Sequence, residues 1–356
     1  MSAIVKGRGS TLQPAVRFDA LAKDYEPEAG LLASQGQGLA RTVVSIDHAR
    51  SIISHNQSPD IGFDQSVNPY RGCEHGCVYC YARPSHAYLG LSPGLDFETR
   101  IFAKPNAAAL LARALSQPSY RVSTLMLGAN TDPYQPAERK HMITRGCLEV
   151  LLERRHPVAI VTKSTLIERD LDLLAKLAAL DLVAVSISLP LLDNDLKRVL
   201  EPRAAAPAAR LACIRALRAA SVPVTVLVAP VIPFINDQDL ERILELAREA
   251  GASSAGYVML RLPLEVAPLF RDWLATHYPE RASRVMAAVQ NMRGGRDNDS
   301  RFGKRMTGAG PYADLLRSRF RRACQRLGLA QRMAPQLDTS RFRAPPQAPG
   351  QASFGF

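Results

Sequence analysis

The feature that constrains the fold most is a repeated alternation of short β-branched runs with longer amphipathic segments. Strands that alternate with helices imply parallel strands joined by right-handed crossovers. We predict strands over Ser66–Tyr70, Ser123–Leu127, Val158–Thr162, Val183–Leu189, Val222–Val228 and Gly256–Leu260. We predict helices over Pro105–Leu115, Pro136–Glu153, Glu168–Ala179, Pro207–Ala220, Asp237–Ala250 and Leu264–His277. About six βα units result, and their spacing alone leaves open a closed barrel, a partial barrel or an open doubly wound sheet.

The composition agrees with helices packed on a parallel sheet, because 47% of the residues are hydrophobic and only 6% are aromatic. Six cysteines in 356 residues do not suggest a disulfide framework. The N-terminus has no apolar run long enough for a signal peptide. The longest apolar region, Leu173–Leu192, is interrupted by Lys176 and Asp181, which argues against a membrane span. We therefore expect a soluble, cytoplasmic protein.

The chain divides into four predicted parts. They are an extended or disordered N-terminal arm over 1–45, a barrel over 46–265, a helical C-terminal extension over 266–328 and a disordered tail over 329–356. Within the extension we predict further helices over Ser283–Met292 and Pro311–Leu327.

Function is expected at the carboxyl ends of the strands, and the first of these ends carries three cysteines. Cys73, Cys77 and Cys80 have the spacing C-x3-C-x2-C, which lets one loop wrap one compact metal centre. Gly72 and Gly76 permit the tight backbone turns that such a loop needs.

Soft thiolates select zinc or iron–sulfur. A structural zinc site normally closes with a fourth ligand, and no further Cys-x-x-Cys or paired His follows at a suitable spacing. Three ligands on a four-iron cluster instead leave one iron open for a cofactor or a substrate. The alternatives are a three-cysteine zinc site completed by a distant residue, or coincidence. Cys147, Cys213 and Cys324 lie singly in helix-like stretches and are expected in the core.

With Tyr79 before its last cysteine, the segment resembles the C-x3-C-x-aromatic-C signature of the radical S-adenosylmethionine (radical SAM) superfamily. Within it, the chain resembles the branch of spore photoproduct lyase, often labelled DNA-repair-photolyase-like, over residues 67–262. The resemblance implies a partial (β/α)6 TIM-like barrel with a helical C-terminal extension. It implies a [4Fe–4S] cluster on Cys73, Cys77 and Cys80, and S-adenosylmethionine on the fourth iron. Cleavage of that cofactor would give a 5′-deoxyadenosyl radical for hydrogen abstraction, with an electron donor of flavodoxin or ferredoxin type.

The same resemblance implies contacts to S-adenosylmethionine. Tyr79 would flank the adenine, Thr131 and Asp132 would receive the methionyl amine, Lys163 would pair with the carboxylate, and Ser186 would reach the carboxylate or the ribose. Ser188 is nearly as good a candidate as Ser186, because residues two apart share one face of a strand. Asp132-Pro133 and Gln135-Pro136 also fit a turn that caps the next helix.

One departure from the lyase branch concerns hydrogen transfer. That branch has a hydrogen-donating cysteine just before its hydroxyl–Asp pair, whereas this chain has Asn130. We therefore expect the cofactor chemistry to carry over without repair of a thymine photoproduct by the same route, and no catalytic residue is assigned.

The formal charge of +12 raises the prospect of an acidic partner, nucleic acid above all. Residues 293–322 hold nine Arg or Lys against three Asp, a net charge of +6. This segment is predicted to contact phosphates, with Phe302 and Tyr312 available for base stacking, or to form a lid over the barrel. The alternatives are a radical SAM enzyme acting on a peptide or small metabolite, and a non-catalytic zinc or DNA-binding protein.

Overall fold

The computed structural model describes residues 5–18, 41–331 and 337–344. Its main sheet has eight strands in the order β11-β10-β9-β8-β7-β6-β3-β2. The six inner strands are all parallel, namely β3 (Gln65–Val67), β6 (Leu125–Leu127), β7 (Val158–Thr162), β8 (Val183–Ser188), β9 (Val224–Val231) and β10 (Ser254–Met259). Antiparallel β2 (Ile53–His55) and parallel β11 (Ala330–Gln331) form the two edges, and they do not pair with each other. The predicted partial (β/α)6 barrel is thus confirmed.

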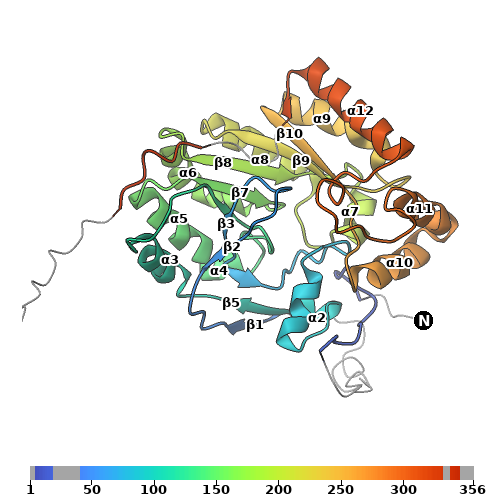
Figure 1. The fold of residues 1–356 in the computed structure, drawn as a ribbon, viewed down its shortest axis with the longest axis horizontal. Helices are drawn as coiled ribbons and strands as arrows, with labels where there is room; N and C mark the ends of the chain where they lie inside the picture. The colour runs from blue at the N-terminus through green and yellow to red at the C-terminus, as the bar shows by residue number, and fades with distance from the viewer. Residues whose placement is uncertain (1–4, 19–40, 332–336, 345–356) are drawn as a thin grey trace, which may run out of the picture.

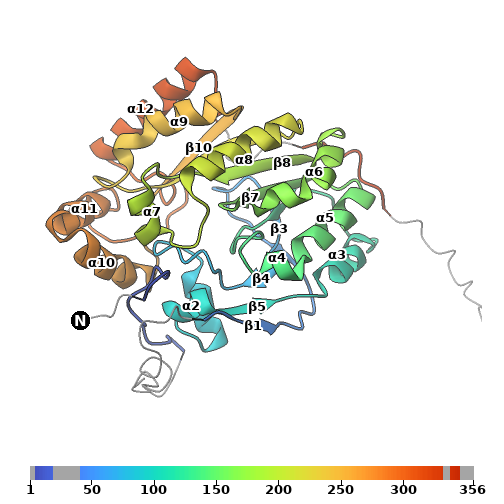
Figure 2. The same cartoon turned by 180° about the vertical axis from the view of Figure 1, so that it is seen from behind.

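Helices cover the outer face of this curved sheet (Figures 1 and 2). They are α3 (Ala107–Leu115), α5 (Ile143–Glu153), α6 (Leu171–Ala178), α8 (Pro207–Ala219) and α9 (Leu240–Glu249). Alternate residues of β8 illustrate the division of the two faces. Val183, Val185 and Ile187 join the core formed with these helices, whereas Ser186 and Ser188 point to the opposite, inner face. The inner face therefore carries small and polar side chains where it approaches the strand ends.

Two predicted elements are interrupted, each at a residue with a physical reason. The first strand splits into β3 and β4 (Tyr70–Arg71) around Pro69, which has no N–H to donate to a ladder. The helix predicted over Pro136–Glu153 breaks into α4 (Glu138–His141) and α5 at Met142, whose φ is 52°. The side chain of Glu138 accepts a hydrogen bond from Thr144 N at 3.1 Å and so caps the new helix start. The helix predicted from Glu168 begins with a 3₁₀ turn, η2 (Thr165–Asp170), before α6.

A second sheet, which the sequence did not predict, supports the loop after β4. Its order is β1-β5-β4, with β1 (Val43–Ile46) parallel to β5 (Arg100–Ala103) and β4 antiparallel to it. The helical elements η1 (Arg83–Leu89) and α2 (Leu95–Thr99) lie between β4 and β5 along the chain. β1 begins within the arm predicted over 1–45, and Arg8 and Ser10 of that arm are buried, so the arm is ordered at these places. Residues 1–4 and 19–40 lie outside the described ranges.

The C-terminal extension has the predicted helices α10 (Val266–His277), α11 (Pro279–Asn291) and α12 (Pro311–Leu327). α12 packs against α9 at one end of the sheet (Figure 1). Two further short elements, α7 (Asn194–Leu200) and η3 (Asp237–Asp239), follow β8 and β9 along the chain.

The tail predicted over 329–356 is ordered in part. β11 pairs with β10, and the ring of Phe342 packs against His156 at 5.4 Å between centroids. Residues 332–336 and 345–356 lie outside the described ranges. Among the described residues, none of the helices combines the length and the apolar character needed to cross a bilayer.

His156 makes the stability of this fold sensitive to acid. Its Nδ1 lies 3.0 Å from Pro157 O and its Nε2 lies 2.7 Å from the Tyr120 hydroxyl. Burial lowers the pKa of His156 to about 4. The unfolded chain takes up this proton below its ordinary pKa of 6.5, whereas the folded protein takes it up only near 4. Acidification through that window therefore favours unfolding by up to about 3 kcal/mol.

We expect the free energy of unfolding, measured with urea, to fall between pH 7 and pH 4.5. In His156→Gln that decrease should be smaller, because the position no longer titrates. His48→Gln, at an exposed position, serves as the control and should keep the decrease of the parent protein. Equal decreases in His156→Gln and the parent would contradict this assignment.

Candidate active site

The three clustered cysteines lie on one loop between β4 and η1. Cys73 and Cys77 are each 7% exposed, Cys80 is half-buried, and all three are free thiols. Gly72 and Gly76 have φ of 75° and 67°, a conformation that favours glycine, so the tight turns expected of the loop are present.

Buried side chains hold the backbone of this loop. The amide of Gln135, which is fully buried, donates from Nε2 to Gly72 O at 3.1 Å and accepts from Glu74 N at 3.0 Å. Arg83, also fully buried, donates from Nε to Cys77 O at 2.9 Å and from Nη2 to Gly76 O at 3.1 Å. The loop carbonyls are therefore fixed by the protein itself.

Asp132 ties the loop to the end of β7. Its carboxylate accepts hydrogen bonds from Tyr134 N at 2.9 Å, Thr162 Oγ1 at 2.7 Å and Lys163 N at 2.8 Å, and it lies 3.3 Å from Nδ1 of the buried His75. Burial opposes ionisation of Asp132, but His75 and these donors outweigh it and lower the pKa to about 2. The carboxylate is thus ionised and fully engaged within the chain.

The neighbouring Thr131 is similarly engaged, because its Oγ1 donates to Tyr70 O at 2.7 Å. Both members of the predicted Thr–Asp pair therefore stabilise the strand ends in this structure. Their contact with the methionyl amine stays a prediction.

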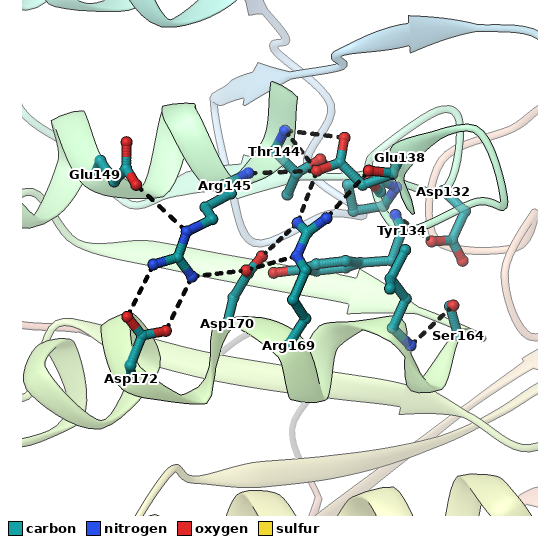
Figure 3. Close-up of polar contacts among 12 residues, drawn as sticks. Asp132, Tyr134, Glu138, Thr144, Arg145, Glu149, Ser164, Arg169, Asp170 and Asp172 are labelled. Atoms are coloured by element: carbon teal, nitrogen blue, oxygen red, sulfur yellow. Dashed lines mark hydrogen bonds and ion pairs between the residues drawn. The ribbon is translucent and has the colours of Figure 1, made fainter. Parts of the chain in front are cut away.

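A network of ion pairs lies behind the Asp132 segment (Figure 3). The fully buried Glu138 accepts from the Tyr70 hydroxyl and pairs with Arg169 at 2.9 Å. The fully buried Asp170 pairs with Arg169 at 2.8 Å and with Arg145 at 3.0 Å. These contacts join α4, α5 and η2, so the turn after β6 has a rigid backing.

A second buried cluster adjoins Cys77. The hydroxyl of Tyr79 donates to Glu201, and Glu201 pairs with Arg210. The Nζ atom of Lys163 lies 5.9 Å from the centroid of the Tyr79 ring. Burial disfavours the charge on Lys163, but Cys77 and Glu201 outweigh it and raise the pKa of the lysine. Two of the predicted residues, Tyr79 and Lys163, are therefore brought together beside one of the predicted cluster cysteines.

Glu201 and Arg210 were missed by the sequence reasoning. Glu201 follows α7, in a stretch where no element was predicted, and Arg210 lies within a predicted helix. Nothing in the local pattern marks either side chain as buried, although they are 0% and 1% exposed. Their pairing depends on how α7 and α8 return to the strand ends.

The two candidate serines of β8 differ in their partners. The Ser188 hydroxyl donates to Ala229 O at 3.3 Å, whereas the Ser186 hydroxyl makes no hydrogen bond to any other described residue. Ser186 is 6% exposed on the inner face of the sheet. Of the two serines, Ser186 thus has the hydroxyl available to a ligand.

The three thiols are arranged for a cluster of several metal ions rather than for a single ion. Burial, and then Glu201, raise the pKa of Cys77 to about 12, so metal binding must displace the proton. Within the described ranges no three His, Cys, Asp or Glu side chains converge on one metal ion, these thiols included. In a four-iron cluster each thiolate binds its own iron, so the sulfur atoms need not converge. The donor set and its enclosure fit such a cluster.

Several cations of the basic segment are already paired. On α12, Arg317 pairs with Asp314 and Arg319 with Glu241, both at 2.6 Å. The buried Arg293 donates to Leu260 O at 2.8 Å and to Arg305 O at 2.8 Å.

Tyr312 is likewise occupied, because its hydroxyl donates to Asp237 at 2.5 Å and its ring packs against Phe234. Its use for base stacking stays a prediction. Phe302, by contrast, is 60% exposed.

A family model described as the radical SAM superfamily matches residues 67–247, half of the chain. The chain belongs to the radical SAM superfamily. Radical SAM proteins are enzymes that use a [4Fe–4S] cluster and S-adenosylmethionine, and they need a reductant. This membership argues against the alternative of a non-catalytic zinc or DNA-binding protein.

Relatives of this radical SAM protein include uncharacterized proteins from bacteria and archaea. One from Mycobacterium tuberculosis is 43% identical over 224 residues, which cover 62% of this chain and 66% of the relative. One from Methanocaldococcus jannaschii is 25% identical over 214 residues, covering 60% of this chain and 76% of the relative. The chain thus spans just under two thirds of the length of the mycobacterial relative that it matches.

Among solved structures, spore photoproduct lyase complexed with dinucleoside spore photoproduct has a TM-score of 0.60 at 14% identity, over 81% of both chains. A cysteine-to-serine mutant of spore photoproduct lyase has a TM-score of 0.58 at 16% identity, covering 82% of this chain and 81% of its own. These likenesses confirm the predicted fold, and at such identities they concern the fold alone.

The Glu201–Arg210 pair yields a prediction about stability. Glu201→Gln leaves the buried guanidinium of Arg210 without its counter-charge, so the free energy of unfolding of the metal-free protein should fall by about 3–5 kcal/mol. Glu249→Gln removes a 63% exposed carboxylate that lies 4.0 Å from Arg242, and should change it by less than about 1 kcal/mol. Urea titration of both variants measures this, and equal effects would contradict the role given to Glu201.

Proposed function

We propose that the protein holds its [4Fe–4S] cluster on Cys73, Cys77 and Cys80 and abstracts hydrogen from a nucleic acid substrate. The proposed contacts to S-adenosylmethionine are Tyr79, Thr131, Asp132, Lys163 and Ser186. The observation that carries the assignment is the enclosure of three free thiols on one backbone-clamped loop at the strand ends. Lys163 and Tyr79 beside Cys77 support the cofactor contacts.

When bound, the cluster supplies the electron for cleavage of S-adenosylmethionine to methionine and a 5′-deoxyadenosyl radical. The residues of this chain bind and orient the cofactor and shield it from water. Lys163 retains its proton because Cys77 and Glu201 favour the charge, and this cation suits the cofactor carboxylate. The Ser186 hydroxyl has no hydrogen-bond partner in the described part of the chain, so it can donate to the same ligand. Burial of the loop excludes water from the reacting centre.

The surroundings of Cys80 support an anionic substrate. Tyr81, which follows Cys80, is 50% exposed, and the guanidinium of Arg261 lies 5.4 Å from its ring centroid. Arg261 donates from Nη1 to the thioether of Met306 at 3.2 Å, a weak acceptor, and has no carboxylate partner among the described residues. A half-buried guanidinium without a counter-charge is suited to receive a phosphate.

A second exposed ring lies in the segment that closes the open side of the barrel. Phe302 has the guanidinium of Arg305 at 5.0 Å from its centroid. The segment joins the two sides of the opening, because Met306 O accepts from Met259 N at 2.8 Å and Gly303 N donates to Asp60 at 2.7 Å. Two exposed aromatic rings, each beside an arginine, suit the stacking of bases in a single strand. We therefore infer a substrate-contacting lid in this segment.

The cluster ligands are tested by substitution. We expect each single substitution of a cluster cysteine by alanine to remove most of the roughly four irons expected per chain and all formation of 5′-deoxyadenosine. The variants are Cys73→Ala, Cys77→Ala and Cys80→Ala, each reconstituted without oxygen. Cys324→Ala, in α12, should keep both. Iron analysis and chromatography of the nucleoside measure these outcomes. A parent protein with four irons that never yields 5′-deoxyadenosine under strong reductant would exclude the proposed reaction.

The nucleic acid substrate is tested by binding. Tyr81→Leu, Phe302→Leu and Arg261→Gln should each weaken binding of a single-stranded oligonucleotide about tenfold, since a stacked base contributes about 1–3 kcal/mol. Arg322→Gln removes an equal charge from α12 and should have little effect. The parent protein should bind more weakly as salt increases.

Absence of binding at low salt, or a salt-independent affinity, would exclude nucleic acid. It would leave the alternative of a peptide or small metabolite as substrate. Transfer of deuterium from a labelled substrate into 5′-deoxyadenosine then identifies the class.

We further propose an electron donor of flavodoxin or ferredoxin type and a cytoplasmic location. The described cysteines are all free, which suits a reducing compartment. The donor is needed because the cluster must be reduced before each cleavage.

A further inference from the structure

Residues 8–12, here named the N-terminal strap, lie directly on the cysteine loop. A methyl group added to Gly9 would overlap Gly76 O and lie 3.4 Å from Val78 N, so the two backbones are in contact on both sides of Cys77. This contact explains the glycine at position 9, because any side chain there would force the strap away from the loop.

One buried carboxylate joins the strap to the loop. Glu98, which is fully buried, accepts from Gly9 N at 3.0 Å and from Ser10 N at 2.9 Å. The same carboxylate pairs with Arg83 at 2.5 Å, and Arg83 holds the carbonyls of Gly76 and Cys77. The strap, the carboxylate, the guanidinium and the loop thus form one continuous hydrogen-bonded unit.

Further contacts hold the strap on either side of Gly9. Arg8 donates from Nη1 to Glu98 O at 2.8 Å and from Nη2 to Thr42 Oγ1 at 2.9 Å. The Thr11 hydroxyl donates to Asp272 of α10. Leu12 packs against the apolar cluster that contains Cys77. A segment more than sixty residues earlier in the sequence is therefore fastened over the loop by side chains of several different elements.

We propose that the N-terminal strap is a cover that positions Cys77 for the cluster and limits access of solvent, oxidants and chelators to it. The inference rests on the proposed cluster site for its purpose, and it assigns a role to residues outside the barrel. Glu98 and Arg83 are positioning residues, because they act on Cys77 through its backbone. The cover acts whether or not the cluster is present, since every contact that holds it is made by the chain itself.

The test compares two matched substitutions in the full-length chain. Gly9→Ala places a methyl group against Gly76 O. The overlapping atoms belong to the backbone, so no side chain can rotate away to make room. Gly146→Ala, in α5, meets nothing closer than the Ala108 side chain at 3.4 Å and serves as the control.

Thiol labelling of the metal-free proteins reports on the cover without any cluster. We expect Cys77 to react with an alkylating reagent at least about tenfold faster in Gly9→Ala than in the parent or in Gly146→Ala, because local opening governs access. Peptide mass spectrometry resolves the sites. Cys147, Cys213 and Cys324 are at most 1% exposed and act as internal references for the whole fold.

Two outcomes would overturn the proposal. One is unchanged labelling of Cys77 in Gly9→Ala. The other is a parallel increase at Cys147, Cys213 and Cys324, which would show that the substitution loosens the whole molecule.

Anaerobic loss of the cluster to an iron chelator, followed by visible absorption, adds a second readout. We expect it to be several-fold faster in Gly9→Ala than in Gly146→Ala, and equal rates would also overturn the proposal. If the parent binds no cluster, the proposed function fails while the labelling result still decides the role of the strap.

Discussion

The arrangement of the site depends on an ion pair that is completely removed from solvent. Arg83 and Glu98 are each 0% exposed, and burying two charges is favourable only where their remaining hydrogen-bonding capacity is used. It is used here: Arg83 also donates to Pro93 O at 3.1 Å and to Gly94 O at 2.9 Å, while Glu98 accepts from two backbone amides. The pair therefore organises irregular backbone that has no ladder of its own.

The cysteine loop is held from the barrel side as well. Asp132 contacts the loop residue His75, and Glu201 accepts a hydrogen bond from the loop residue Tyr79. Gln135 bonds to the backbone of the loop at Gly72 O and Glu74 N. Asp132 and Gln135 lie in the turn after β6, whereas Glu201 follows α7 after β8, so the conformation of the loop depends on two different strand ends. The same contacts therefore stabilise the fold and fix the geometry of the site.

The sequence predicted well what depends on local pattern and poorly what depends on distant pairing. Strand–helix alternation was enough for the parallel sheet, and the spacing of the cysteines was enough for the family. The sequence around Glu201 and Arg210 does not indicate a buried ion pair, because the two side chains meet only after α7 and α8 have packed. The second sheet was missed because β1 and β5 lie more than fifty residues apart and are four residues each. Asp132 was predicted to bind a ligand or to form a turn, whereas its hydrogen bonds to Thr162 and Lys163 at the end of β7 were not foreseen.

The main sheet ends at β2 and β11 without closing, and the segment from Arg301 to Met306 spans the gap by contacts to Asp60 and Met259. The circumference of the barrel is consequently not set by hydrogen bonds between strands. Its width on this side depends on the length of one connection between α11 and α12. Insertions or deletions in that connection can enlarge or narrow the entrance while every strand stays in place. Related chains can therefore differ in the size of the substrates they accept while the cysteine loop stays the same.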